Sequence, residues 1–217
     1  MIIKKMLAAH IFLKLLKFIN IFKKINLFDI GSRDGTFAKD YEKKFKVYKV
    51  DANSKKKEIT KVAFFSKRTT KTLYIYKNNA SLYKINNDLL LKKKKIKVET
   101  INNYISTVNK NNLFAIALDC EGANLDILKP LIKSEFKKKL ILIFSEVEKK
   151  EIFIKAPLFK EFCKTMKNYN YQLLYFQDFH NKDQSNAIFC CKNFYIFFIL
   201  FIFFYRIMFF IKNNLKK

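Results

Sequence analysis

Short apolar runs separated by polar turns fill the middle of the chain. Two of them, at 113–118 and 139–144, are almost continuously apolar, which is typical of central strands buried on both faces of a sheet. The other predicted strands are 25–30, 46–50, 59–65, 72–76, 171–176 and 187–191, with a short strand entering a helix over 98–105. Predicted helices are 36–44, 123–131 (broken at Pro130) and 157–168. This alternation indicates an open α/β sheet.

The first apolar run leads into the stretch Leu27–Gly35, which reads Leu-Phe-Asp-Ile-Gly-Ser-Arg-Asp-Gly. A strand, a tight glycine turn and a helix-like segment form the first unit of a sheet that binds a nucleotide-like ligand at its carboxyl edge. Gly31 is expected to give the turn a backbone angle that other residues avoid, and Gly35 to let the backbone approach a ligand. Asp29 is placed to accept a hydrogen bond or to face a cation.

The second strand ends at Asp51-Ala52-Asn53. An acid about 20 residues after the first glycine is where such folds hydrogen-bond ribose hydroxyls. We therefore interpret Asp51 as a ribose ligand. The alternative is that it is a strand-end turn residue.

Two later strands also end in acids. The apolar run 113–118 stops at Asp119-Cys120-Glu121-Gly122, and 139–144 is followed by Ser145-Glu146. Carboxylates at the carboxyl ends of central strands lie where these sheets place their chemistry. The alternative for Glu121 and Glu146 is that they cap helices or pair with lysines.

Residues 1–24 are apolar with lysines threaded through them, and His10, Lys14 and Lys17 share one side of a helical wheel. We interpret this segment as an amphipathic helix that packs on the domain. The alternative is a basic helix that lies on a membrane. The lysines interrupt the apolar core that a secretory signal requires.

The last segment, 193–217, contains an almost wholly apolar run at 194–211 and a basic end. An 18-residue helix is about 27 Å long, close to the thickness of the hydrocarbon core. We expect a tail embedded in or lying on a membrane, with Arg206 reaching the interface. The alternatives are a helix packed on the domain or in an oligomer, and a translated segment beyond the true domain whose sequence has arisen by mutational drift.

Composition changes this picture little. The formal charge of +26 would ordinarily indicate nucleic acid or an anionic membrane as partner. The excess is lysine alongside abundant Asn, Ile, Phe and Tyr, the residues of an AT-rich coding sequence, so we interpret most of it as solvated surface. The four cysteines show neither metal-site spacing nor a disulfide framework, which favours a reduced, cytoplasmic setting.

Several stretches of 25–192 resemble motifs of one family. The most specific is 116–124, Ile-Ala-Leu-Asp-Cys-Glu-Gly-Ala-Asn, which is similar to Leu-Lys-Ile-Asp-x-Glu-Gly-Ala-Glu. The other matching stretches are Phe28–Gly35, Val50–Asn53 (for Phe-Glu-Pro-Asn), Ser81-Leu82, Val98–Ile101 and Ile143–Val147. Together they resemble the FkbM-type S-adenosylmethionine-dependent methyltransferases. Ala117, Asn102 and Asn124 depart from the family's Lys, Asp and Glu.

The resemblance implies a class I methyltransferase fold, which is a Rossmann-like, seven-stranded sheet with its last strand antiparallel and helices on both faces. It also implies methyl transfer to a hydroxyl of a sugar, glycan or similar metabolite. The residues expected to bind S-adenosylmethionine are Asp29, Gly31, Gly35, Asp51 and Asn53. Those expected at the methyl-transfer site are Asp119, Glu121 and Glu146.

A hydroxyl is a poor nucleophile, so the enzyme must align the reactants and remove a proton. One of the carboxylates is the expected base, aided by burial that raises its pKa. The alternative is that Asp119 and Glu146 hold Mg²⁺, which would acidify the hydroxyl. The sequence leaves both open.

Three other functions are alternatives to hydroxyl methylation. A nicotinamide-dependent dehydrogenase needs three glycines in its fingerprint, whereas this chain has 3 Gly in all and one of them is Gly122. Nucleic-acid methylation is disfavoured because Pro130 and Pro157 stand in neither a Pro-Pro-aromatic nor a Pro-Cys context, and no RNA-binding module is visible. The third rival is a catalytically degenerate, membrane-attached binding protein, which the three departures favour.

Overall fold

The computed structural model describes residues 7–214 with gaps at 38, 40–41, 77–78, 86–89, 110–111 and 180–182; in the last helix, side chains are described up to Ile207, with Arg206 excepted. The strands of the main sheet are β1 (Ile25–Ile30), β2 (Lys46–Val50), β7 (Leu113–Leu118), β8 (Leu140–Glu148), β9 (Tyr171–Gln177) and β10 (Gln184–Cys191). The α-helices are α2 (Leu7–Phe22), α3 (Ile101–Val108), α4 (Asn124–Lys133), α5 (Phe159–Asn168) and α6 (Tyr195–Asn214).

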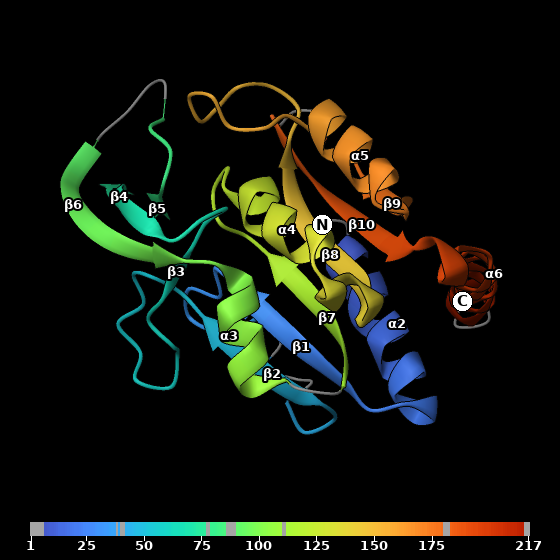
Figure 1. The fold of residues 1–217 in the computed structure, drawn as a ribbon. Coiled ribbons are helices and arrows are strands. Elements are labelled where there is room, and N and C mark those ends of the chain that lie inside the picture. The colour runs from blue at the N-terminus through green and yellow to red at the C-terminus, as the bar shows by residue number, and fades with distance from the viewer. Residues whose placement is uncertain are drawn as a thin grey trace.

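The main sheet has six strands in the order β2-β1-β7-β8-β10-β9 (Figure 1). The first four are parallel, and β10 runs antiparallel to both of its neighbours. Strand order reverses between β1 and β7, because β2 continues on one side of β1 and the later strands on the other. The mixed α/β architecture with a mostly parallel central sheet is therefore confirmed.

A strand was expected over 59–65, but most of this range does not form one. Thr60 makes one isolated parallel bridge to Val50, and its N–H donates to the carbonyl of Lys49 at 3.0 Å. The chain then turns away, so that β3 (Ala63–Phe64) pairs with β6 in a second sheet. The main sheet therefore has six described strands rather than the seven that the resemblance implies, and its edge beside β2 carries a single bridge.

The second sheet has the order β3-β6-β4-β5 and includes β4 (Thr69–Tyr76), β5 (Ala80–Ser81) and β6 (Leu90–Glu99). Its longest strand, β6, comes from the lysine-rich stretch in which no strand was predicted. Lys92, Lys93 and Lys95 are exposed, and β6 is held by an antiparallel ladder with β4. This sheet lies beyond the carboxyl edge of the main sheet (Figure 1).

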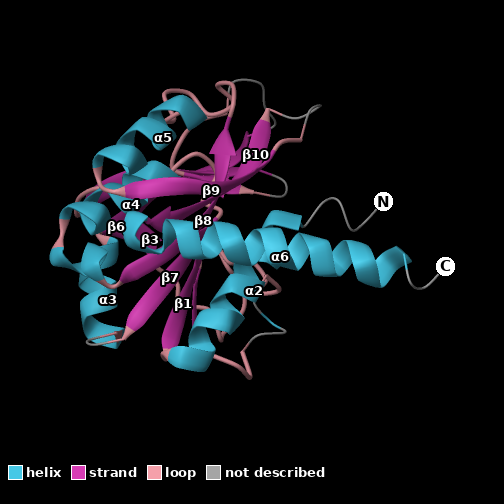
Figure 2. Cartoon of the chain, turned by 90° about the vertical axis from the view of Figure 1, so that its right-hand side faces the viewer, coloured by secondary structure: helices cyan, strands magenta, loops and turns pink. Residues whose placement is uncertain are grey.

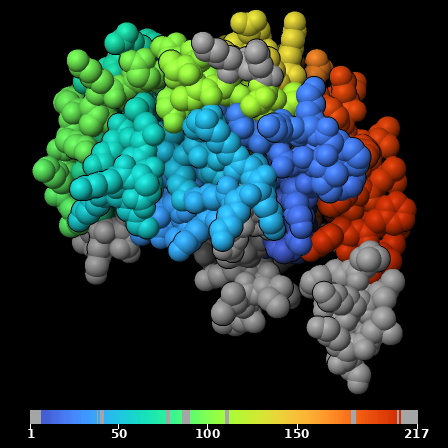
Figure 3. Space-filling model, turned by 90° about the horizontal axis from the view of Figure 1, so that it is seen from below, coloured from blue at the N-terminus to red at the C-terminus, as the bar shows by residue number. Residues whose placement is uncertain are grey.

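Helices cover both faces of the main sheet (Figures 1 and 2). One apolar layer joins the sheet to α3, α4 and α5 through buried side chains such as Ile105, Leu128 and Phe162. The other joins it to α2 and α6 through Phe12 and Phe198. In Figure 3 the surface of the C-terminal residues lies beside that of the N-terminal helix, although the two are at opposite ends of the chain.

The N-terminal helix packs on the domain, which is the first of its two predicted interpretations. Ala8, Phe12, Leu15 and Leu16 of α2 are fully buried against the sheet. Its last turn differs, because Ile21 is 70% exposed and does not join the apolar face. Among the described residues, no helix is long and apolar enough to cross a membrane.

Two helix predictions differ from the structure. Of 36–44, the residues that the structure describes lie in turn or loop conformations or, at Lys39, in 3₁₀ geometry, and none is α-helical; α2 covers this face of the sheet together with Phe37 and Phe45. Pro130 does not break its helix, since α4 continues to Lys133. Pro130 lacks an N–H, but its carbonyl accepts a hydrogen bond from Nδ2 of Asn102 at 3.1 Å.

Candidate functional site

A cavity of about 480 Å³ lies at the carboxyl edge of the main sheet, where the strand order reverses. Its polar wall comes from the ends of β1, β2 and β7 and includes Gly31, Asp51, Asn53, Asp119 and Glu121. The second sheet supplies a largely apolar wall, which includes Val62, Phe64, Leu73, Ile75 and Leu91. A ligand with one polar side and one apolar face fits these two walls, and reversal points of α/β sheets are where such folds bind ligands.

Gly31 allows the ends of β1 and β7 to meet. Its φ of +81° is left-handed, and a Cβ built there would lie 2.0 Å from the backbone oxygen of Asp119. Its N–H donates to the carbonyl of Val50 at 2.8 Å, which ties the turn to β2 as well. The predicted role of Gly31 as a turn residue is confirmed, and no other residue fits without moving β7.

Asp51 fastens the glycine turn to the loop after β2. Its carboxylate accepts hydrogen bonds from the N–H of Arg33 at 3.0 Å and from the N–H of Asn53 at 2.7 Å. Ser54 strengthens the same junction by donating to the carbonyl of Arg33 at 2.9 Å. Each carboxylate oxygen retains further acceptor capacity, so Asp51 can hold the turn and still accept from a ligand hydroxyl.

Asp29 and Gly35 are absent from the cavity lining, in contrast to the prediction that they contact the cofactor. Asp29 is only 4% exposed. The positive charge of Lys49 lowers the pKa of the Asp29 carboxyl group, but burial has the larger, opposite effect. Burial raises the pKa of Asp29 to about 7. Gly35 has a φ of +74°, and a Cβ there would meet only the side chain of Lys49, so Gly35 shapes the turn without facing the cavity.

Asp119 and Glu146 form a hydrogen-bonded pair of carboxyl groups at the ends of β7 and β8. Asp119 is exposed to the cavity, and the surrounding protein desolvates its carboxyl group enough to raise its pKa. Burial, followed by the charge of Asp119, raises the pKa of Glu146 well above its usual range. With its pKa raised to about 9, Glu146 is therefore protonated at neutral pH and donates to Asp119, although Glu146 itself, a predicted site residue, does not line the cavity.

Glu121 lines the cavity in a strained backbone conformation, with a φ of +47°. Ser81, from the second sheet, donates its hydroxyl to the carbonyl of Glu121 at 2.6 Å and accepts from the N–H of Tyr83 at 2.9 Å. Burial raises the pKa of Glu121 to about 7, with the charge of Asp119 adding to the effect. Ser81 thus positions a carboxylate that is close to half ionised at neutral pH.

Glu148 and Gln184 belong to the same cluster and were not predicted as site residues. Glu148 is 4% exposed, and burial raises its pKa to about 7. Gln184 of β10 donates to Oε2 of Glu146 at 2.9 Å and also hydrogen-bonds Glu121 and Glu148. The spacing of Glu146 and Glu148 could have identified Glu148 as a site residue, because residues two apart in a strand share a face.

Within the described residues, neither Glu121 nor Glu146 forms an ion pair with a lysine.

The three departures from the family motif lie outside the cavity lining. Ala117 is 3% exposed and packs in the layer beneath α2. Asn102 lies between α3 and α4, where it bonds to Pro130. Asn124 accepts from the N–H of Cys120 at 2.8 Å and donates to the carbonyl of Glu146 at 2.8 Å, so it joins the ends of β7 and β8.

Within the described residues, no group of three His, Cys, Asp or Glu side chains is arranged to hold a metal ion. His180, in the polar loop before β10, lies outside the described residues. Comparison with protein-family models and with curated proteins finds no match for this chain.

Proposed function

We propose that the chain is an S-adenosylmethionine-dependent methyltransferase of the class I type, acting on a hydroxyl of a glycan or similar metabolite. The observation that carries this proposal is the arrangement at the carboxyl edge, where Gly31 brings the ends of β1 and β7 together beside Asp51 and Asp119. The order β2-β1-β7-β8-β10-β9 supports it, because the order reverses beside β1 and the last strand, β10, is antiparallel, as the class I fold requires of its seven strands, of which six are described here.

The cavity suits this cofactor in three respects. Asp51 has spare acceptor capacity for ribose hydroxyls beside the glycine turn. The apolar wall of Val62, Phe64 and Leu73 can cover a flat aromatic base. Asp119 and Glu121 line the same cavity, and carboxylates complement a sulfonium cation. When bound, S-adenosylmethionine supplies a methyl group activated for attack by its positive sulfur.

The chain's own part in the reaction is to orient the acceptor hydroxyl and take its proton. Glu121 is the best general base, because it lines the cavity and its pKa is raised to about 7, near the operating pH. Asp119 lines the cavity and can accept from the acceptor hydroxyl, whereas Glu146 does not line it and acts on Asp119 through their hydrogen bond. Because the three departures lie outside the cavity, they give no support to the inactive binding protein considered above.

The test is transfer of labelled methyl groups to a panel of sugars and other hydroxylated acceptors. Glu121→Gln keeps the shape of the side chain and removes the base, so kcat should fall on the order of 100-fold or more, with the cofactor KM little changed. Glu135→Gln, a matched change of an exposed residue at the opposite edge, should leave kcat unchanged. Full activity in the Glu121 variant would remove Glu121 from the mechanism.

The pH dependence gives a second readout. The pKa of Glu121 is raised to about 7, so activity that needs its ionised form should rise as the pH increases through about 7. A kcat profile that is flat between pH 6 and about 8 would contradict its role as base.

A further inference from the structure

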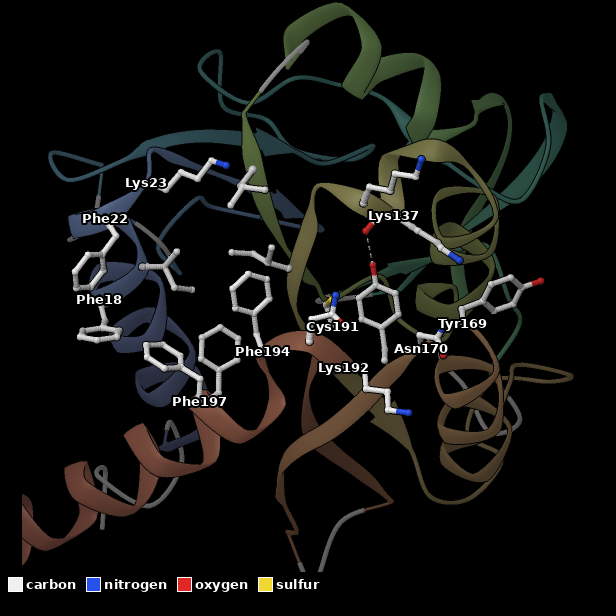
Figure 4. A pocket seen from close by; sticks show the side chains of 17 residues that line it. Phe18, Phe22, Lys23, Lys137, Tyr169, Asn170, Cys191, Lys192, Phe194 and Phe197 are labelled. Carbon is white, nitrogen blue, oxygen red and sulfur yellow. Dashed lines mark hydrogen bonds between the residues drawn. The ribbon is translucent and has the colours of Figure 1, made fainter.

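A second and larger hollow lies at the opposite edge of the main sheet (Figure 4). This groove has a volume of about 1010 Å³ and lies where β7, β8 and β9 begin and β10 ends. Its lining includes Leu113, Ile141, Tyr171 and Cys191. Because the cavity described above lies at the carboxyl ends of the strands, the sheet itself separates the two hollows.

One end of the groove is aromatic. Phe18 and Phe22 of α2 face Phe197 of α6 and Phe194, which directly precedes α6, across the groove (Figure 4). The rings of Phe18 and Phe197 stack with centroids 5.4 Å apart, and those of Phe18 and Phe22 meet edge to face at the same separation. Phe22 and Phe197 remain 75% and 47% exposed, so this aromatic end is open to the surroundings.

The aromatic end continues into the outer surface of α6. Ile196, Leu200, Phe203 and Phe204 of this helix are between 50% and 74% exposed. A contiguous apolar surface of this kind indicates a binding face, because water does not stabilise it.

The other end of the groove is basic. Lys137, Lys138 and Lys192 stand around it, with Lys23 at the aromatic side, and none of the described residues that line the groove is Asp or Glu. None of these four lysines forms an ion pair with a described carboxylate. Tyr169, whose ring lies 6.0 Å from the ammonium group of Lys137, and Asn170 add polar atoms at the same end.

We propose that this groove and the exposed face of α6 bind an anionic phospholipid at a membrane surface. The acyl chain would lie against the exposed rings of Phe22 and Phe197, and the headgroup would meet Lys137 and Lys192. The positive rim of the groove, formed by Lys137, Lys138 and Lys192, argues for this occupant over a second copy of the chain. A second copy would bring the same lysines and a net charge of +26, and the two would repel each other. An apolar helical face with basic residues at its border is typical of binding in the interface plane.

The test is sedimentation of the full chain with vesicles of phosphatidylcholine containing about 30% phosphatidylglycerol, a composition chosen to give a negative surface potential. The rim variant Lys137→Ala/Lys138→Ala/Lys192→Ala should lower partitioning on the order of 100-fold. Lys92→Ala/Lys93→Ala/Lys95→Ala removes the same charge from exposed positions on the second sheet and should lower it only about threefold. Equal losses in the two variants would overturn the proposal, because they would show attraction by net charge alone.

A fluorescent reporter tests the chain-binding end, since the protein has no Trp. In Phe197→Trp, lipids with brominated acyl chains should quench the emission, whereas Tyr74→Trp on the second sheet should not be quenched. Quenching of neither variant, or of Phe197→Trp by purely zwitterionic vesicles to the same extent, would contradict the proposal. Release of the protein by inorganic phosphate at constant ionic strength would also contradict it, because the occupant would then be a free anion.

Discussion

Gly31 and Gly35 share a left-handed backbone but differ in what a methyl group would meet. At Gly31 the obstacle is the backbone of Asp119, which cannot move without displacing β7. At Gly35 it is the flexible side chain of Lys49. We therefore expect Gly31→Ala to lower the free energy of unfolding by about 3 kcal/mol or more, and Gly35→Ala by about 1 kcal/mol from backbone strain alone.

Urea denaturation of both variants measures this difference. Equal losses of stability would contradict the close approach of the two strand ends on which the carboxyl-edge cavity depends.

Asp29 provides a test of burial through pH. Its pKa is raised from 3.8 to about 7, so the folded state holds a proton that the unfolded state has lost. The group therefore makes the protein less stable as pH rises from about 4 to about 7. Asp29→Asn mimics the protonated form, and we expect it to raise the free energy of unfolding at about pH 8 by up to about 4 kcal/mol, with little change near pH 4.

Denaturant titrations at the two pH values measure this effect. Destabilisation by Asp29→Asn at the higher pH would mean that the ionised carboxylate is well paired, and that the charge of Lys49 outweighs the cost of burial.

Individual site residues were predictable where they follow the end of a parallel strand. Asp51, Asp119 and Glu121 stand directly after apolar runs, and the sheet brings such ends to one edge. Gln184 was not predictable in this way, because it reaches the cluster from β10, which runs in the opposite direction. Asp29 was placed in the site by its neighbours in the motif, but strand alternation turns its side chain beneath the turn.

At the scale of elements, α2 replaces the helix that was expected after β1 as the cover of one sheet face. Phe12 is fully buried in this helix and packs on Phe37 and Phe144, with ring centroids 6.3 and 5.6 Å away. Phe12→Ala should therefore cost about 3–5 kcal/mol of stability. Phe22 of the same helix is 75% exposed, and Phe22→Ala should change stability by less than about 0.5 kcal/mol.

Thermal and urea unfolding of the two phenylalanine variants test whether α2 is part of the folded domain. A small effect of Phe12→Ala would contradict the packing of α2 on the sheet.

Strand positions were predictable where burial is two-sided, and less so elsewhere. The ranges of β1 and β7 match the predicted runs, because central strands of a parallel sheet are apolar almost throughout. β6 has no such pattern: its lysines are exposed, and its ladder with β4 is what holds it. The strand predicted over 59–65 is reduced to Ala63–Phe64, which pair with β6 in the second sheet and do not extend the main sheet.

At the scale of the whole molecule, the main sheet separates two hollows of different character. The carboxyl edge holds a cavity with carboxylates on one wall, and the amino edge holds a groove with lysines at its rim. The sequence predicted the first, because it lies within continuous motifs. It did not predict the second, which is assembled from α2, α6, the beginnings of β7, β8 and β9 and the end of β10, segments from both ends and the middle of the chain.

The central claim is that the carboxyl-edge cavity binds S-adenosylmethionine. Calorimetric titration of the full chain with S-adenosylhomocysteine tests it most directly, together with Asp51→Asn and a matched control, Asp34→Asn. Asp34 is an acid of the same turn that bonds to the N–H of Thr36 at 3.1 Å and does not line the cavity. Both substitutions remove one charge while keeping an acceptor oxygen.

We predict micromolar binding by the native chain, roughly 10-fold or greater weakening in Asp51→Asn, and near-native binding in Asp34→Asn, since a lost charge-assisted hydrogen bond costs about 1.5–3 kcal/mol. Absence of binding by the folded native chain, or equal weakening in the two variants, would contradict the assignment of this cavity to the cofactor.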